Sequence, residues 1–265
     1  MSDATVILGR DERGVATLTL NRPERHNAFD DAVIAELDAA LATVAADDSI
    51  RLLILASEGK SFSAGADLGW MQRMASYGEA ENLADAGALA EMLRKLNSLP
   101  QPTIARVQGA AYGGAVGLVS CCDLAVGSTL ARFCLSEVKI GLIPATISPY
   151  VIAAMGPRAA RRYFTTAEVI DAEQALGLGL LSEVVGVDDL DEAVEGMVAT
   201  LLGNGPAAIR QAKRLVLDYG DQPITPELIA DSCQRIADIR ASEEGQAGLS
   251  AFLDKSDPPW RSSGV

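Results

Sequence analysis

Two glycine-containing turns are the segments of this 265-residue chain best suited to chemistry. Residues 61–68 have the sequence Ser-Phe-Ser-Ala-Gly-Ala-Asp-Leu, and residues 109–115 have Gly-Ala-Ala-Tyr-Gly-Gly-Ala. Each turn follows an expected strand and precedes an expected helix, where backbone N–H groups lack partners. Two such N–H groups that converge on one oxygen form an oxyanion hole, provided that small side chains let the ligand reach the backbone. Either turn alone also fits a purely structural role.

Other familiar site types do not match these turns. Neither contains the dinucleotide pattern G-x-G-x-x-G, the P-loop pattern or the G-x-S-x-G turn of α/β-hydrolases. The single histidine, His26, excludes most histidine-based triads and histidine-rich metal sites unless it is itself the working residue. Because His26 stands beside a proline turn, a surface or packing role is the alternative.

The cysteines and the N-terminal residues indicate the cellular setting. Cys121, Cys122, Cys134 and Cys233 fit neither a disulfide framework nor a zinc pair, so we expect four buried, reduced thiols and no metal. The first ten residues lack a basic stretch followed by an apolar core, which is the pattern of a signal peptide. These features predict a cytoplasmic protein.

Charge and hydropathy narrow the classes of partner. The chain carries a net charge of −14, which disfavours binding to nucleic acids and anionic membranes because such polyanions repel an acidic surface. The longest uncharged runs, Val107–Cys122 and Ile140–Pro157, are interrupted by glycines or prolines and do not predict a membrane span. Neither argument applies to a small anion, which needs only a local cluster of donors.

The elements that must position the two turns follow from hydrophobic periodicity. Strands and helices alternate through the first two-thirds of the chain, and this pattern predicts an α/β core over residues 1–187. Helical spacing alone continues beyond it and predicts a helical region over 188–265. The expected strands are Val15–Leu20, Ile50–Ala56, Thr103–Gln108 and Asp123–Val126, and the expected helices are Asp31–Ala46, Glu79–Leu99, a helix ending at Cys122, Leu190–Leu202, Pro206–Tyr219 and Pro226–Leu253.

Four segments in order, Leu20–Ala28, Phe62–Leu68, Val107–Asp123 and Phe133–Pro144, resemble the crotonase superfamily, the enoyl-CoA hydratase/isomerase group. The resemblance implies an α/β spiral of β-β-α units with a C-terminal helical trimerisation region. It also implies an acyl-CoA substrate, a homotrimer or dimer of trimers, and no cofactor, since coenzyme A is part of the substrate.

The same resemblance assigns roles to individual residues. The N–H groups of Ala66 and Gly114 would hold the thioester oxygen, and losing one such donor to a developing enolate costs on the order of 3 kcal/mol. For Phe252 and Lys255, which would act from a neighbouring subunit, helix packing and a solvated charge are the alternatives. The residues expected to bind coenzyme A or substrate are Arg25, His26, Ala28, Ala64, Asp67, Leu68, Pro144, Phe252 and Lys255.

The number of carboxylates bears on the reaction. Hydratases of this family commonly use two glutamates, and the corresponding positions here are Gly117 and Glu137. An apolar cleft would raise the pKa of Glu137 toward neutrality, which suits it to exchange a proton. One glutamate fits a hydratase, an isomerase, or a decarboxylase or inactive paralogue. An RNA-binding role is a further alternative, which the net charge of −14 disfavours.

Four longer stretches, 62–71, 105–114, 117–123 and 135–150, resemble bacterial methylglutaconyl-CoA hydratases and the related isohexenylglutaconyl-CoA hydratases, which also have glycine at the first glutamate position. Their substrates carry a second carboxylate. That carboxylate, Glu81 or Asp85 would then handle the second proton, although a solvated helix face is the preferred interpretation of these two acids. Arg161 and Arg162 are candidates to meet a distal carboxylate, with a salt-bridged helix surface as the preferred interpretation.

Overall fold

The computed structural model describes residues 4–261, and these form two compact units. The first unit contains residues 4–99 and 103–194, and the second contains residues 100–102 and 195–261.

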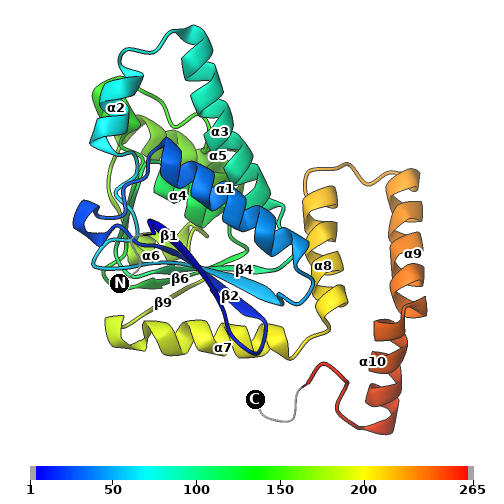
Figure 1. Ribbon diagram of the computed structural model, residues 1–265. Coiled ribbons are helices and arrows are strands. Elements are labelled where there is room, and N and C mark those ends of the chain that lie inside the picture. Colours follow the sequence, from blue (N-terminus) through cyan, green and yellow to red (C-terminus); the bar gives the residue numbers. More distant parts are fainter. Residues whose placement is uncertain (1–3, 262–265) are drawn as a thin grey trace. The chain divides into compact units, whose positions relative to one another are not determined.

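A six-stranded sheet is the centre of the first unit (Figure 1). Its strand order is β1-β2-β3-β4-β6-β9; β1 and β2 are antiparallel and the remaining neighbours are parallel. A second, three-stranded sheet has the order β5-β7-β8. The strands are β1 (Val6–Arg10), β2 (Val15–Leu20), β3 (Leu52–Ser57), β4 (Thr103–Val107), β5 (Ala110–Tyr112), β6 (Leu124–Ser128), β7 (Arg132–Cys134), β8 (Ile170–Asp171) and β9 (Glu183–Val185).

Helices cover one side of the six-stranded sheet (Figure 1). Helix α1 begins because the Asp30 carboxylate accepts a hydrogen bond from the Val33 N–H at 3.1 Å, and its apolar side chains at helical spacing are buried. The helices are α1 (Asp31–Ala46), α2 (Leu68–Met74), α3 (Glu79–Asn97), α4 (Gly114–Ser120), α5 (Ser148–Thr166) and α6 (Ala172–Gly177), with 3₁₀ turns η1 (Pro23–Arg25), η2 (Glu137–Ile140) and η3 (Val187–Asp189).

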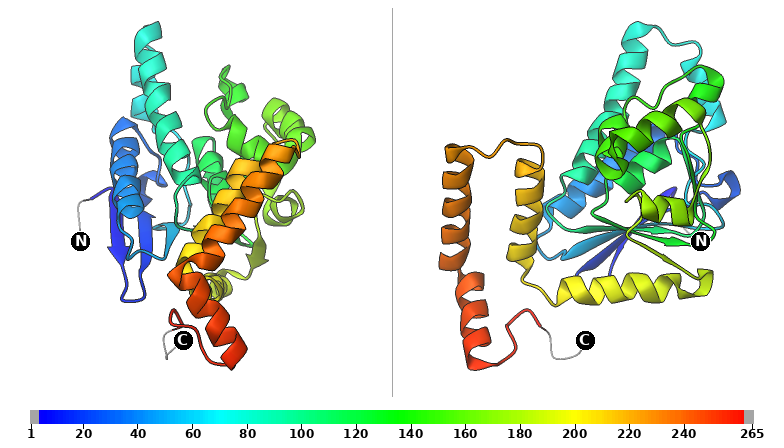
Figure 2. Two further views of the ribbon diagram at one scale, coloured as in Figure 1. Left: turned by 90° about the vertical axis from the view of Figure 1, so that its right-hand side faces the viewer. Right: turned by 180° about the vertical axis from the view of Figure 1, so that it is seen from behind.

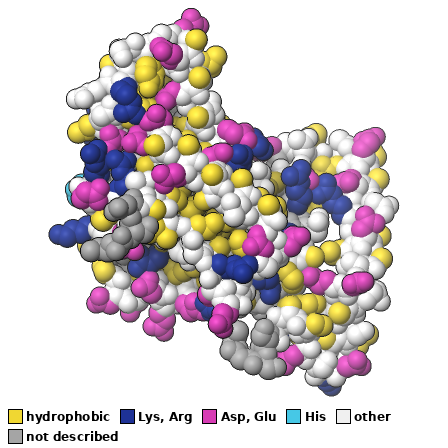
Figure 3. All heavy atoms as spheres, viewed as in Figure 1, with side chains coloured by type: hydrophobic (Ala, Val, Ile, Leu, Met, Phe, Trp, Pro, Cys, Tyr) yellow, Lys and Arg dark blue, Asp and Glu magenta, His cyan; other side chains and the backbone are white. Residues whose placement is uncertain are grey.

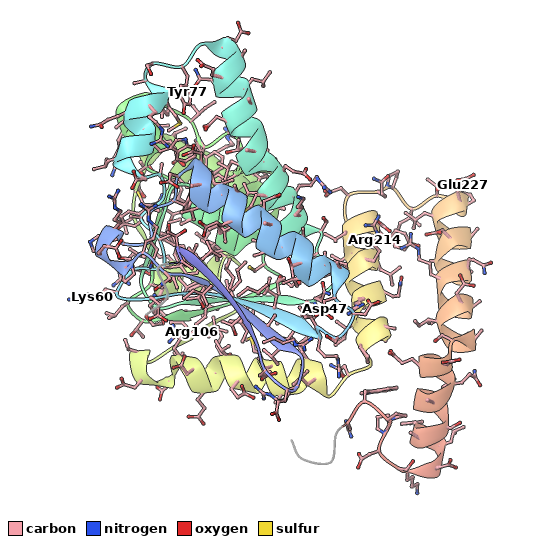
Figure 4. The ribbon with its side chains drawn as sticks, viewed as in Figure 1. Asp47, Lys60, Tyr77, Arg106, Arg214 and Glu227 are labelled. Carbon is pink, nitrogen blue, oxygen red and sulfur yellow. The ribbon has the colours of Figure 1, made fainter. Side chains whose placement is uncertain are left out.

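Helix α7 (Leu190–Leu202) begins in the first unit and continues into the second. Arg106 on β4, labelled in Figure 4, forms an ion pair of 2.6 Å with Asp191 in the first turn of this helix.

The second unit also contains helices α8 (Pro206–Tyr219), α9 (Pro226–Ala241) and α10 (Glu243–Asp254). The sequence predicted one helix over Pro226–Leu253, and this is wrong. Ser242 has extended backbone angles, and its hydroxyl accepts a hydrogen bond from the Gly245 N–H at 3.0 Å, so it ends α9 and caps α10 (Figure 2). The Glu244 carboxylate caps α8 by accepting hydrogen bonds from the N–H groups of Ala207 and Ala208.

Two other expectations have clear outcomes. All four cysteines are outside disulfides, but only Cys121 and Cys134 are buried; Cys122 is half-buried, and Cys233 is exposed because the described helix α9 buries none of its residues. The prediction of four buried thiols is therefore wrong for two of them.

Within residues 4–261, no helix is both long enough and apolar enough to cross a membrane.

Candidate active site

The fold brings the two glycine-containing turns side by side. The Ser63 N–H donates to the Ala110 carbonyl and the Tyr112 N–H donates to the Ser63 carbonyl, both at 3.0 Å. Gly65 has a φ of +87°, and a Cβ on it would lie 2.6 Å from the Tyr112 carbonyl oxygen. Only glycine can adopt this left-handed conformation without a side chain that collides with the Tyr112 carbonyl. Gly65 therefore allows the two turns to lie this close together.

The N–H of Ala66 is free because of how Phe29 pairs with this turn. The Phe29 N–H donates to the Gly65 carbonyl and the Asp67 N–H donates to the Phe29 carbonyl, both at 2.9 Å. In such a parallel bridge the residue between the two partners, Ala66, turns its own N–H away. Across the described residues 4–261, this N–H has no hydrogen-bond acceptor.

The second free donor is the N–H of Gly114, the first residue of α4. The residue before it, Gly113, has a φ of +54° and provides no side-chain cap. The Gly113 N–H donates to the Cys134 carbonyl at 2.8 Å, whereas the Gly114 N–H finds no acceptor in the part of the chain that the structure describes. The two N–H groups that the sequence singled out are thus both available to a ligand oxygen.

Glu137 lies beside this second turn. A Cβ on Gly113 would be 3.3 Å from the Glu137 Oε1 atom, so the carboxylate lies beside the Gly113 backbone. The other oxygen, Oε2, is buried and has no hydrogen-bond partner among residues 4–261. Burial raises the pKa of Glu137, and a hydrogen bond from its own backbone N–H opposes the shift only in part. The carboxyl is therefore shifted in the direction that favours proton exchange near neutral pH.

The position that resembles the first glutamate of the family has no room for a side chain. Gly117 is buried in α4, and a Cβ there would lie 2.3 Å from the Ile147 Cγ2 atom and 3.6 Å from the Leu93 Cδ2 atom. Two apolar side chains therefore fill the space that a side chain at this position would need. Ile147 is a feature that sequence reasoning missed, since an isoleucine in an apolar run carries no chemical signal.

The two acids considered for a second proton both have structural partners. The Glu81 carboxylate accepts a hydrogen bond from the Gly78 N–H at 2.8 Å and caps α3. The Asp85 carboxylate accepts a hydrogen bond from the Trp70 Nε1–H at 2.9 Å. Glu81 is exposed, as expected for a solvated helix face, whereas Asp85 is half-buried; each also has a role in holding α3.

Arg25 and Asp67, two of the expected coenzyme A ligands, form an ion pair of 3.0 Å. Asp67 is buried and caps α2 through the N–H groups of Gly69 and Trp70. Burial alone would raise the pKa of Asp67, but hydrogen bonds from Arg25 and from these N–H groups lower it overall. The Arg25 side chain is 58% exposed, so its remaining donors can reach a ligand.

The other expected ligands in the first unit differ in exposure. His26 is exposed, and its Nδ1 atom lies 3.1 Å from the Ser61 Oγ atom. Ala64 and Leu68 are exposed beside the oxyanion turn, whereas Ala28 and Pro144 are buried. Binding of coenzyme A by these residues stays a prediction.

The remaining candidates lie on other surfaces. Phe252 and Lys255 lie at the end of α10 in the second unit, where both are exposed, and their role stays a prediction. Arg161 and Arg162 are exposed on α5, and Arg162 pairs with Glu168 and lies 5.1 Å from the centre of the Tyr163 ring. The salt-bridged surface expected for this pair is confirmed at Arg162.

Asp and Glu side chains spread over the visible face of the molecule (Figure 3). Among the described residues, His, Cys, Asp and Glu form no group of three or more that could hold a metal ion.

Comparison with known proteins identifies the family. Residues 10–263 match the family model described as enoyl-CoA hydratase/isomerase. The chain belongs to this family. An enoyl-CoA hydratase of Shewanella pealeana is similar in structure, with a TM-score of 0.93 and 46% identity over 97% of this chain and 96% of that one.

Two named hydratases are similar in sequence to this chain. The crotonyl-CoA hydratase of Syntrophomonas wolfei is 31% identical over 96% of this chain and 97% of its own length. The 2,3-dehydroadipyl-CoA hydratase of Escherichia coli is 31% identical over 97% of this chain and 98% of its own length. These matches confirm the crotonase-type α/β fold with a helical C-terminal region, and they show that the chain is an enzyme of the enoyl-CoA hydratase/isomerase family.

Proposed function

We propose that this enzyme adds water across the conjugated double bond of a branched 2-enoyl-CoA, methylglutaconyl-CoA or a close relative. The observation that carries the proposal is the buried, unpartnered Oε2 of Glu137 beside the turn that presents the Gly114 N–H. The free N–H of Ala66 completes a pair of donors for the thioester oxygen.

The proposed chemistry uses one carboxylate for both proton transfers. Glu137 removes a proton from water as the water oxygen bonds to Cβ of the enoyl group, and the double-bond electrons move onto the thioester oxygen. The N–H groups of Ala66 and Gly114 stabilise this enolate. Glu137 then returns the proton to Cα, so that one water is added and the carboxylate is regenerated.

The choice of acyl group rests on Gly117 and its surroundings. Since Ile147 and Leu93 fill the space beside Gly117, the protein offers no second carboxylate there. The proposed substrates carry a second carboxylate of their own, and both proton transfers remain with Glu137. The four stretches that resemble methylglutaconyl-CoA hydratases favour the same class of substrate, and one relative is named for a 2,3-dehydroadipyl-CoA substrate.

An enoyl-CoA isomerase is the second candidate, and the single carboxylate favours it. In that reaction Glu137 would move a proton between Cα and Cγ of the same enolate, with no water added. The oxyanion donors would act identically, so the geometry of Ala66 and Gly114 does not separate the two reactions.

A homotrimer or dimer of trimers in the cytoplasm is part of the proposal. Helices α8 and α10 expose large apolar side chains, among them Val216 at 71%, Phe252 at 80% and Leu253 at 77%. Exposed apolar groups of this size are typical of surfaces that another chain covers. Light scattering on the purified protein tests the assembly, and a monomer would contradict it.

The deciding experiment is a turnover assay with crotonyl-CoA, a 3-enoyl-CoA and 3-methylglutaconyl-CoA, with the products analysed by mass. We expect a gain of one water, with 3-methylglutaconyl-CoA as the best substrate. An unchanged mass with a shifted double bond would replace hydration by isomerisation, and loss of carbon dioxide would replace it by decarboxylation.

A further inference from the structure

The side chain and the backbone of Phe29 contact both halves of the oxyanion hole. Its backbone bonds to Gly65 and Asp67 on either side of Ala66. Its ring lies against Gly114, where a Cβ would be 2.7 Å from the Phe29 Cζ atom. One residue therefore touches the two segments that carry the donor N–H groups.

We propose that Phe29 is a positioning residue that fixes the N–H groups of Ala66 and Gly114 relative to each other. The proposal rests on the oxyanion role given to these groups under the proposed function. The two donors belong to turns that are separated by the whole of α2 and α3 in the sequence, and stabilisation of an enolate requires both to point at one oxygen.

The backbone bridge sets the direction of the first donor. Because the Phe29 N–H and carbonyl hold Gly65 and Asp67, the peptide plane of Ala66 is fixed and its N–H faces away from Phe29. This contribution depends on the backbone and does not change when the side chain is replaced.

The ring sets the position of the second donor. The Phe29 side chain is 1% exposed and supports the first turn of α4 at Gly114, a position where any larger residue would collide with it. A smaller side chain at position 29 would leave a cavity under this turn, and the turn would relax into it.

A chain of contacts holds the ring in place. Phe29 packs against Trp70 with ring centres 6.5 Å apart and planes inclined by 48°. The Trp70 indole N–H donates to Asp85 on α3 at 2.9 Å, and its backbone N–H donates to Asp67 at 3.3 Å. Helices α2 and α3 thus hold the ring against α4, which gives Asp85 an indirect part in the geometry of the site.

The test compares Phe29→Leu with the wild-type enzyme. The variant keeps the backbone bridge and loses the ring, so kcat should fall by about ten- to a hundredfold, as expected when a reacting group is misplaced by up to about 1 Å. KM should change less. The carbonyl stretch of bound acetyl-CoA, measured by infrared difference spectroscopy, should shift to lower frequency in the wild type and shift less in the variant.

Leu41→Ala is the matched control, because Leu41 is equally buried but lies on α1 among core side chains. It should lower the melting temperature without changing the carbonyl stretch. Trp70→Phe, which keeps a ring but loses the bond to Asp85, should change kcat and the stretch in the same direction as Phe29→Leu and by less; it also serves as the test variant if Phe29→Leu does not fold.

Two results would overturn the inference, and they differ. A carbonyl shift that is present in the wild type and unchanged in both variants would remove the positioning role and leave the oxyanion hole intact. A wild-type enzyme that binds acetyl-CoA with no carbonyl shift would remove the oxyanion hole itself, and the role of Phe29 with it.

Discussion

Positions 117 and 137 correspond to the two glutamates of the common hydratase pattern, but their surroundings differ in kind. Glu137 keeps a carboxylate with one buried oxygen that lacks a partner among the described residues. Gly117 has no side chain, and Ile147 occupies the space beside it. Burying an unpaired carboxylate costs free energy, so a protein retains one only where it is used and fills other space with hydrocarbon. The difference supports the proposal that Glu137 carries out both proton transfers.

The largest effect should come from removing the proton carrier. We expect Glu137→Gln to lower kcat by about 100- to 10,000-fold, the usual contribution of general acid–base catalysis, while acetyl-CoA binding measured by calorimetry stays within a few-fold. Glu12→Gln, at an exposed glutamate, is the control. Near-normal turnover by Glu137→Gln would remove the functional distinction between the two positions.

The pH dependence of kcat/KM in the wild-type enzyme tests the role of Glu137 in the same comparison. In the proposed mechanism the deprotonated form of Glu137 is the active one, and burial raises its pKa above the ordinary glutamate value. We therefore expect kcat/KM to fall about tenfold per pH unit on the acidic side, starting at a pH above that value. A rate that stays flat down to pH 4.5 would show that no carboxyl with a raised pKa controls the reaction.

The filled space beside Gly117 is tested by adding one methyl group at this position. Gly117→Ala places a Cβ against Ile147, and such overpacking should cost about 1–3 kcal/mol, measured as a lower melting temperature at fixed protein concentration. Combining it with Ile147→Ala should be less harmful than the sum of the two single changes. Gly87→Ala on α3, which meets nothing within 4 Å, should not destabilise. Additive effects would mean that Ile147 does not fill the space.

The smallest expected effect is the contribution of the Glu137 carboxyl to the pH dependence of stability. A carboxyl whose pKa is higher in the folded state favours folding while it is protonated, and this contribution is lost as pH rises through the folded-state pKa. Glu137→Gln should therefore melt at a higher temperature than the wild type at pH 7, with the difference disappearing below about pH 4.3, the usual pKa of a glutamate in an unfolded chain. A variant less stable at neutral pH would indicate that the carboxylate has a stabilising partner.

Much of the fold could be predicted from periodicity. Helices Asp31–Ala46, Leu190–Leu202 and Pro206–Tyr219 have the expected bounds, because apolar spacing and capping residues are local signals. The break at Ser242 was missed because the apolar pattern continues across it and the serine acts only through its own backbone geometry.

The site was predicted in part. The two glycine turns were found from their small residues between an expected strand and an expected helix, and Glu137 was found because its segment resembles a known family. Phe29, Trp70 and Ile147 were not singled out for any role in the site, since aromatic and aliphatic residues in apolar runs are indistinguishable from general core. The partners of Glu81 and Asp85 were also missed, because a charge on a helix gives no indication of which donor lies opposite.

The sequence by itself determined the family, the donors Ala66 and Gly114, and the presence of one carboxylate, since these follow from residue identity and order. The tertiary structure alone decided that both N–H groups lack partners, that one oxygen of Glu137 is buried, and that hydrocarbon closes the space at Gly117. The reason is physical: a free donor, a raised pKa and a filled cavity are properties of the space between segments that lie far apart in the chain, and only folding creates that space.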